Sequence, residues 1–312
     1  MLFHLKSEDF KNFIENISIK LNIDVDIIEK DYYIYLILKE LSKKQEDLKA
    51  YFKGGTAIYK ILDTMNRFSE DIDITVKTIS NESNTKNRKR LKESALNYNI
   101  EGLKLIKNKC INNKGSITGF YQYNSAFENS ELPLQRAGKI QVESTSFTVS
   151  EPTEKYYIEP LIYKFANFKE KQILEEKFNI KKLEIETVKL ERMFIDKIFA
   201  TEFYYIRNMY MDTAKHLYDI SVLFNNYKIK NLLENKEELN KLIYYKRQEE
   251  KKRLGGIEEN IAIKDFSYFK LNFNNEMIKA FENMQEKYVL NKKYKYTINQ
   301  VNEVLKKLYA KI

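Results

Sequence analysis

Residues 53–76 read KGGTAIYKILDTMNRFSEDIDITV, and this stretch decides the fold. A Gly-Gly pair follows Lys53, and apolar residues then recur at the spacing of one helix face. The stretch ends in a β-branched segment that sets Asp71 and Asp73 one residue apart. The pattern predicts a strand that ends at a glycine turn, then a helix and a second strand.

The two aspartates share one face of the second strand, because alternate side chains of a strand point to the same side. Ile72 and Ile74 then point to the other side. Two carboxylates whose Cα atoms are roughly 7 Å apart can converge on one hard cation such as Mg²⁺, or bridge two. Taken alone, the same pattern also fits an edge strand with one face in solvent.

The glycines before the helix indicate a place for a phosphate. Gly54 and Gly55 precede the expected helix start, with Thr56 as the expected N-cap. Free N–H groups at a helix start favour an anion, and glycine lets a phosphate approach the chain closely. No Gly-Lys-Ser/Thr follows, so this is not a P-loop, and it is not a Rossmann fingerprint either. One half of the stretch is therefore predicted to hold phosphate, and the other half the metal ion bound to it.

Composition limits the class of protein. The 312 residues are enough for two cores, and eight glycines and three prolines favour long helices over a loop-rich chain. The net charge of +9 suits a polyanion such as RNA or a nucleotide, although a lysine-rich codon bias explains it equally well. The net charge alone therefore does not identify a binding partner.

Cysteine and histidine usage excludes several kinds of site. Cys110 is the single cysteine, so an internal disulfide framework or a cysteine-based zinc site is excluded, and a reducing, cytoplasmic setting is expected. His4 and His216 cannot form a histidine-pair metal motif, and a Ser–His–Asp site would rest on His216 alone. The N-terminus does not resemble a signal peptide, and the apolar run 32–38 is too short to span a bilayer, so no membrane role is expected.

The patterning along the chain predicts two domains. Residues 8–21, 25–42 and 84–97 are expected to be helical, and alternating segments between 99 and 149 are expected to be antiparallel strands. The chain after about residue 185 has a helical pattern throughout. These patterns predict an α/β domain over 1–165 and a helical domain over 166–312.

Four stretches of the sequence resemble motifs of a known protein family. "KGGTAIYKIL…RFSEDIDI" resembles the first motif of the DNA polymerase β-like nucleotidyltransferases, and most closely that of the AbiEii/AbiGii toxin family, h-G-[GS] followed by D-h-[DE]-h. The spacer is slightly longer than is usual in the family, which predicts an extra turn of helix. Three more stretches are similar to family motifs, in the family's order over residues 25–225: IEKDYYIYLIL (28–38), ERMFIDKIFA (191–200) and AKHLYDISVLF (214–224).

The resemblance implies both a fold and an activity. The fold class is α+β, a polymerase β-like nucleotidyltransferase domain with a mixed or antiparallel sheet, followed by a helical bundle. The implied activity is Mg²⁺-dependent transfer of NMP from an NTP to an RNA acceptor, with tRNA expected and two metal ions. The implied role is that of a toxin in an abortive-infection toxin–antitoxin pair, neutralised by a cognate antitoxin from a neighbouring gene. The alternatives are transfer to a protein or small molecule, and a non-catalytic RNA-binding protein on the same fold.

The resemblance also implies roles for residues of the first domain. Asp71 and Asp73 would hold Mg²⁺ and the triphosphate, and Gly54 and Gly55 would approach its β- and γ-phosphates. A third carboxylate is usual on a neighbouring strand, as metal ligand or as base, and Glu143 in KIQVESTS is the candidate.

Other nucleotide-binding candidates have ordinary explanations beside the functional one. Ser69, two residues before Asp71 and expected on the same strand face, would bond a phosphate, be modified by a partner, or be a plain strand-start hydroxyl. Lys53 would touch phosphate or be a solvated lysine. Thr56 belongs to the same predicted phosphate-binding turn. Lys30 and Asp31 match the first helical motif and are expected to buttress the cleft.

Two helices of the second domain carry the remaining candidates. By resemblance, Lys197 pairs with the triphosphate, and Lys215, His216 and Asp219 belong to the active cleft. The ordinary explanations are a surface salt bridge for Lys197 and an i, i+4 pair between Lys215 and Asp219. Two basic stretches, 227–253 with its tyrosines and 85–92, are candidates for RNA contact or for solvated helices.

Overall fold

The computed structural model describes residues 1–62, 67–127, 138–253 and 255–312. The chain divides into two compact units, and each is described by itself. Unit 1 comprises Met1–Asp63 and Phe68–Thr187, and unit 2 comprises Thr64–Arg67 and Val188–Ile312.

Unit 1 is built on one mixed sheet. Among the described residues, eight strands form this sheet in the order β3-β5-β6-β2-β1-β8-β7, with β4 paired to β5. β2 runs parallel to β6 and β1 parallel to β8, whereas β1–β2, β5–β6, β3–β5 and β4–β5 are antiparallel. The strands are β1 (Ala50–Lys53), β2 (Asp71–Val76), β3 (Leu103–Leu105), β4 (Ile111–Asn113), β5 (Ser116–Tyr123), β6 (Lys139–Thr145), β7 (Thr153–Ile158) and β8 (Leu183–Val188).

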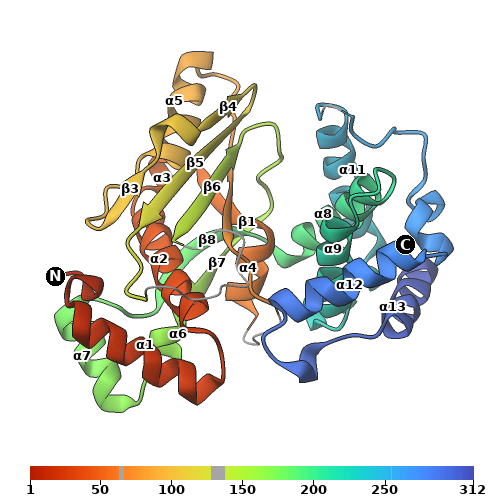
Figure 1. The fold of residues 1–312 in the computed structure, drawn as a ribbon. Helices are drawn as coiled ribbons and strands as arrows, with labels where there is room; N and C mark the ends of the chain where they lie inside the picture. The colour runs from red at the N-terminus through yellow and green to blue at the C-terminus, as the bar shows by residue number, and fades with distance from the viewer. Residues whose placement is uncertain (63–66, 128–137, 254) are drawn as a thin grey trace. The chain divides into compact units, whose positions relative to one another are not determined.

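Seven α-helices accompany this sheet in the described part of unit 1, and one of them forms much of its core. Helix α2 is buried along almost its whole length, and its Ile34, Ile37 and Leu38 are completely inaccessible to solvent. Helix α5 packs on β5 and β6, and α4 packs on β1 and β2 (Figure 1). The helices are α1 (Ser7–Leu21), α2 (Val25–Ser42), α3 (Gln45–Leu48), α4 (Gly54–Ile61), α5 (Asn84–Leu96), α6 (Leu161–Lys164) and α7 (Phe168–Phe178), with 3₁₀ turns at Phe3–Leu5 and Lys107–Lys109.

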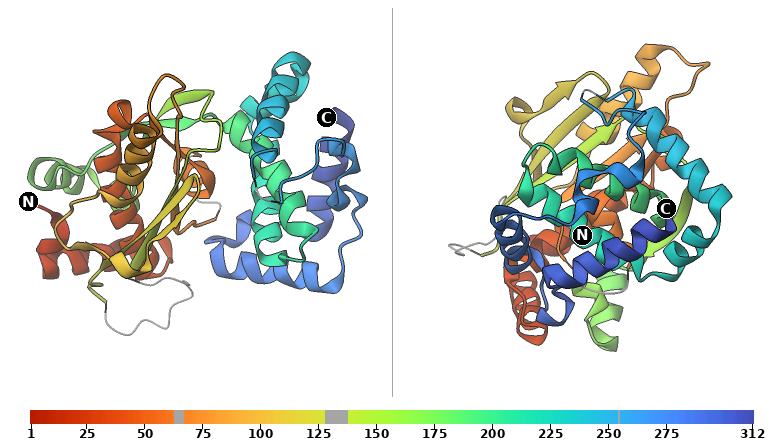
Figure 2. Two further views of the ribbon diagram at one scale, coloured as in Figure 1. Left: turned by 90° about the horizontal axis from the view of Figure 1, so that it is seen from above. Right: turned by 90° about the vertical axis from the view of Figure 1, so that its right-hand side faces the viewer.

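Unit 2 is helical over its described residues. Helices α8 and α9 pack against each other, and α12 and α13 both pack on α9, as the views in Figures 1 and 2 show. The helices are α8 (Leu190–Tyr205), α9 (Tyr210–Phe224), α10 (Tyr227–Glu234), α11 (Lys236–Glu250), α12 (Asn275–Tyr288) and α13 (Ile298–Lys311), with 3₁₀ turns at Ile263–Asp265, Ser267–Lys270 and Lys292–Tyr294. None of the described helices in either unit combines the length and the apolarity needed to cross a bilayer.

The predicted α+β class with a mixed sheet and a helical C-terminal region is confirmed. The boundary between the units follows Thr187, whereas the sequence placed it at residue 165. The reason is β8, which pairs in parallel with β1 through Phe52 and Thr187 and so keeps α7 and β8 in unit 1. Helix α4 ends at Ile61, and the part of the spacer at 63–66, on which the predicted extra turn depends, lies outside the described residues.

Candidate active site

The turn between β1 and α4 brings a glycine against the carboxylate of Asp73. Gly54 has a φ of +82°, a conformation that side chains other than glycine rarely adopt. A Cβ built on Gly54 would lie 1.9 Å from Oδ2 of Asp73, far inside any allowed contact. The backbone at the start of α4 and the Asp73 carboxylate therefore meet because position 54 has no side chain.

Strand register places the other candidates of unit 1 beside Asp73. Asp73 is opposite Lys53 of β1 and opposite Glu143 of β6, and Asp71 is opposite Gln141. Cross-strand partners point to the same face of a sheet, so Lys53, Asp71, Asp73 and Glu143 share one face. All four are partly exposed, whereas the alternating residues Ile72, Ile74 and Val142 are completely buried.

Hydroxyl groups surround this face of the sheet. Lys53 Nζ donates to Thr145 Oγ1 at 3.2 Å, and Ser116 Oγ donates to Glu143 Oε1 at 3.2 Å. Neither of these two hydrogen bonds involves the carboxylate of Asp71 or Asp73. The expected sidedness of KIQVESTS, with Gln141 and Glu143 on one face, agrees with the burial of its strand, in which these two are the more exposed residues.

Two local predictions about this stretch are wrong. Helix α4 begins at Gly54 with Lys53 as its N-cap residue, so Thr56 lies inside the first turn and is not the N-cap. Its hydroxyl donates instead to the carbonyl oxygen of Asp71, which ties α4 to the start of β2. Ser69 is half-buried and lies before the first residue of β2, so it does not belong to the strand face on which the sequence placed it.

The carboxylates of β2 have the chemistry that Mg²⁺ needs. Mg²⁺ is held in proteins by one or two carboxylates together with water and phosphate oxygens. Asp71 and Asp73 supply two such groups, and the Asp73 carboxylate lies directly against the helix start at Gly54. No group of three or more His, Cys, Asp or Glu side chains within the described ranges is placed to hold a metal ion. Glu143 as a third ligand therefore stays a prediction.

Helix α2 braces the same part of unit 1 through buried ion pairs. Lys30, which is fully buried, lies 2.7 Å from the carboxylate of Glu70, the residue directly before Asp71. Asp31 pairs with Lys60 of α4 and accepts a hydrogen bond of 2.7 Å from the backbone N–H of Leu161. These contacts fit the predicted buttressing role of Lys30 and Asp31.

Sequence reasoning missed the partners in this brace. Glu70 and Lys60 are the groups that Lys30 and Asp31 bind, and neither was singled out. For Glu70 a signal was available, because a charged residue directly before a largely apolar strand is costly to bury without a partner. For Lys60 there was none, because its position on α4 is that of an ordinary helix-surface lysine.

In unit 2, the candidates on α8 and α9 meet at Asp219. Lys197 Nζ lies 2.8 Å from Asp219 Oδ2, and Arg67 binds the same carboxylate with Nε at 2.7 Å and Nη2 at 2.8 Å. Asp219 is 4% exposed. Burial opposes its ionisation, but the charges of Arg67 and Lys197 outweigh burial, so the pKa of this carboxyl lies below its usual range. Asp219 is therefore an anion that two cations hold in place.

Arg67 is the main residue that the sequence did not assign. It lies in the opening stretch, four residues before Asp71, and it belongs to unit 2 by its contacts. Its bidentate contact with Asp219 spans 152 positions of the chain, which no periodicity can reveal.

The remaining candidates of unit 2 differ from expectation in their contacts. Lys215 pairs with Asp212 at 3.3 Å, so the expected i, i+4 pair with Asp219 is wrong. The ring of His216 stacks on Tyr204 with centroids 5.3 Å apart. Burial, and after it the charge of Lys197, lowers the pKa of His216 well below its ordinary value, so its imidazole is neutral at neutral pH.

The motif at residues 191–200, which contains Lys197, contributes side chains to two separate clusters of ion pairs. Arg192 lies 3.0 Å from Asp196 and 2.6 Å from Glu249 of α11, and Lys246 of α11 lies 3.2 Å from the same glutamate. This buried network connects α8 with α11. Lys197, directly after Asp196 in the chain, bonds Asp219 instead.

Comparison with known proteins identifies the family. A family model described as "Nucleotidyl transferase AbiEii toxin, Type IV TA system" matches residues 36–304. Among solved structures, the nucleotidyltransferase toxin MenT4 of Mycobacterium tuberculosis H37Rv aligns with 91% of this chain and 94% of its own, at 12% identity and a TM-score of 0.43. No curated protein sequence matches. The family match covers most of the chain, which therefore belongs to the AbiEii family of nucleotidyltransferase toxins of type IV toxin–antitoxin systems.

Proposed function

We propose that unit 1 binds an NTP with Mg²⁺ and transfers its NMP moiety to a hydroxyl group of an RNA acceptor, with tRNA as the expected RNA. The observation that carries the proposal is the meeting of Gly54 and Asp73. It brings the first N–H groups of α4, which have no acceptor within the helix, next to a carboxylate of β2. Phosphate and its metal ion need these two kinds of group side by side.

The residues of unit 1 have complementary roles in this reaction. The amides at the start of α4 and Lys53 would hold the β- and γ-phosphates, and Asp71 and Asp73 would hold the metal ion. Bound Mg²⁺ would stabilise the negative charge that develops on the phosphate oxygens. The acceptor oxygen attacks the α-phosphorus, the bond from this phosphorus to the β-phosphate oxygen breaks, and pyrophosphate leaves. Glu143 is proposed to take the proton of the acceptor hydroxyl, because it lies opposite Asp73 and its carboxylate accepts one hydrogen bond from a neutral group, the hydroxyl of Ser116.

The residues of unit 2 enter the proposal through the family motifs that they match. Lys197 and Asp219 are proposed to be needed for transfer, with Lys215 and His216 contributing to nucleotide binding. Lys197, Asp219 and Arg67 form a buried cluster of ion pairs. Because burying a charge costs much free energy, the cluster supports a specific role for these side chains.

RNA is the acceptor that the charge of the chain favours. The resemblance to the family implies an RNA acceptor, and the net charge of +9 suits such a polyanion better than a protein or a small molecule. Because the family is that of a toxin–antitoxin system, an antitoxin is the second macromolecular partner.

One experiment tests the activity and the acceptor together. The full chain is incubated with each α-radiolabelled NTP, with Mg²⁺ and with either total RNA or a protein extract, and a parallel set contains excess EDTA. Label in RNA that depends on Mg²⁺ supports the proposal. Label in protein would show that the acceptor is a protein. RNA binding without label in any reaction would show that the chain is a non-catalytic member of the fold.

A further inference from the structure

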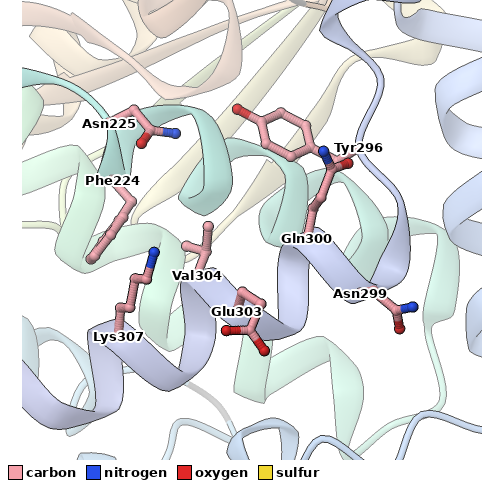
Figure 3. A pocket seen from close by; sticks show the side chains of 8 residues that line it. All are labelled: Phe224, Asn225, Tyr296, Asn299, Gln300, Glu303, Val304 and Lys307. Carbon is pink, nitrogen blue, oxygen red and sulfur yellow. The ribbon is translucent and has the colours of Figure 1, made fainter.

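Unit 2 contains a cavity that the reaction described above does not use. It has a volume of about 360 Å³ and lies between the C-terminal end of α9 and the helix α13. This volume is at the lower end of the range of small-molecule sites, about 300–1,000 Å³. Figure 3 shows Phe224 and Asn225, at the end of α9, facing the side of α13 that carries Val304 and Lys307.

The wall of the cavity combines flat apolar surface with amide groups. Phe224 and Val304 are apolar, Tyr296 adds an aromatic ring, and Asn225 and Gln300 add side-chain amides (Figure 3). An amide carries both hydrogen-bond donors and an acceptor. An unpaired nucleobase presents the matching combination, a flat ring for stacking and an edge with donors and acceptors.

The ring of Tyr296 is held in position by its neighbours. Gln285 of α12 bonds the backbone of Tyr296 on both sides, donating to its carbonyl at 2.9 Å and accepting from its N–H at 2.7 Å. Tyr218 of α9 donates to the carbonyl of Tyr294 at 2.9 Å, and its ring meets that of Tyr296 edge-on, with centroids 5.6 Å apart. The wall is therefore formed before any ligand arrives, which lowers the entropy cost of binding.

One lysine lines the cavity, and two more lie close to Tyr296 in the sequence. Lys307 lines it, and Lys292 and Lys293 precede Tyr296 by four and three residues. None of these three lysines has a carboxylate within 4.0 Å among the residues that the structure describes. By contrast, Lys246 and Arg247, in the basic stretch 227–253 singled out from the sequence, are engaged with carboxylates or backbone carbonyls. The cavity wall thus carries one cation for a phosphate, Lys307, while its carboxylate, Glu303, pairs with Lys306 at 2.8 Å; much of the charge of the stretch 227–253 is used internally.

We propose that this cavity binds an unpaired nucleotide of the RNA acceptor. The base stacks on Tyr296 over the apolar wall, and Lys307 contacts the adjoining phosphate. The Nε2 group of Gln300 donates to the edge of the base, because its Oε1 already accepts from the N–H of Thr297 and Nδ2 of Asn225 already donates to the carbonyl of Ser221. The inference rests on the proposed function, since it assumes that the acceptor is RNA, and it gives unit 2 a role in selecting acceptors with unpaired bases.

The test measures RNA binding separately from transfer. Fluorescence anisotropy follows the binding of a labelled single-stranded RNA and of a blunt RNA duplex to the full chain carrying Asp71→Asn. Tyr296→Ala should weaken binding of the single strand roughly tenfold, the size expected for loss of one stacked base, and Tyr296→Phe should restore it. The matched control is Tyr309→Ala, which removes a tyrosine that is 44% exposed on α13 of the same unit and should leave the affinity unchanged.

A second variant keeps the test decisive if Tyr296→Ala disturbs folding, which circular dichroism detects. Lys307 is exposed on α13, so Lys307→Ala should fold normally and reduce the slope of log affinity against log salt by about one phosphate contact. Unchanged affinity in Tyr296→Ala and Lys307→Ala, absence of RNA binding by the parent chain, or an effect on antitoxin binding alone would each overturn the inference. If the transfer assay labels RNA but Tyr296→Ala and Lys307→Ala bind RNA as tightly as the parent, the role of the cavity is refuted and the proposed function stands. If the transfer assay labels protein while RNA binding depends on Tyr296, the proposed RNA acceptor is refuted and the cavity still binds RNA.

Discussion

Gly54 and Asp73 are in such close contact that a Cβ at position 54 would lie 1.9 Å from the Asp73 carboxylate. One residue starts α4 and the other lies in β2, so this contact brings the two halves of the first family motif together. Position 54 therefore requires glycine for two reasons: its φ is positive, and a side chain there would collide with the Asp73 carboxylate.

Replacing this glycine should therefore damage activity more than stability. Gly54→Ala must keep a φ of +82°, which costs about 1–2 kcal/mol, and its methyl group must displace the Asp73 carboxylate. We expect NMP transfer to be lost while thermal unfolding shows a folded chain. Gly115→Ala is the matched control, because Gly115 has a φ of +77° and its nearest neighbour is a side chain, Phe147, at 3.3 Å. Equal activity loss in both variants would refute a specific role of position 54.

The carboxylates of β2 should be needed for chemistry and dispensable for folding. Asp71→Asn and Asp73→Asn change only partly exposed side chains, and loss of a group that merely supports a metal ligand already costs about 10–100-fold in metal affinity or activity. We expect each variant to lose more than about a hundredfold in transfer rate, with an unfolding midpoint near that of the parent. In addition, Mg²⁺ with NTP should raise the unfolding temperature of the parent chain and leave that of Asp71→Asn unchanged. A variant with full activity would show that the metal is held elsewhere.

Local sequence patterns predicted which side chains share a face of strand β2. The alternation of Asp71, Ile72, Asp73 and Ile74 indicated which side chains share a face, because a strand has a period of two whatever it pairs with. Position 143 could be placed on a face for the same reason. The register that puts Glu143 opposite Asp73 was not available from the sequence, because it depends on a parallel pairing of β2 with β6.

Features set by distant pairing could not be predicted. The strand β8 joins unit 1 through its pairing with β1 and β7, so a helical pattern after residue 185 gave no reason to extend the domain. Helical spacing suggested Lys215 as the partner of Asp219, but Arg67 and Lys197 reach that carboxylate from other segments. Tertiary ion pairs outweigh an i, i+4 pair, which is worth only about 0.2–0.5 kcal/mol.

The Asp219 cluster should make unit 2 sensitive to the loss of one cation. Arg67→Leu leaves a buried carboxylate with a single cation, and breaking a buried ion pair costs about 3–5 kcal/mol. We expect urea unfolding at neutral pH to show a loss of this order. The double variant Arg67→Leu with Asp219→Leu should recover part of it, because the uncompensated charge is then removed as well. A double variant that is less stable than Arg67→Leu would argue against this account.

Acid should weaken the same cluster. Because the folded-state pKa of Asp219 is depressed, its contribution to stability is fully present above its unfolded pKa of about 4 and is lost as the pH falls below that value. The free energy of unfolding of the parent should therefore fall more steeply between pH 5 and pH 3 than that of Asp219→Asn. Parallel slopes for the two proteins would show that the carboxyl is not preferentially ionised in the folded chain.

A buried carboxyl of unit 1 should produce the opposite dependence on pH. Glu29 on α2 is 1% exposed, and its carboxylate accepts hydrogen bonds from Ser125 Oγ at 2.6 Å and from the N–H of Ala126 at 2.8 Å. Burial raises its pKa to about 7; the two hydrogen bonds oppose this rise, and the nearby Asp26 charge adds to it. The folded chain thus binds a proton that the unfolded chain has released, and stability falls as the pH rises from about 4.5 to about 7.

Glu29→Gln should remove this part of the pH dependence. Glutamine has nearly the same shape and no charge to release, so the variant should gain stability relative to the parent as the pH rises, by up to about 3 kcal/mol at pH 8. Urea unfolding of both proteins at pH 5 and pH 8 measures the difference. Glu40→Gln, a change on the more exposed part of the same helix, is the control and should follow the parent at both pH values. If Glu29→Gln also follows the parent, the Glu29 carboxyl has an ordinary pKa, and its hydrogen bonds to Ser125 and Ala126 fully offset the cost of burying its charge.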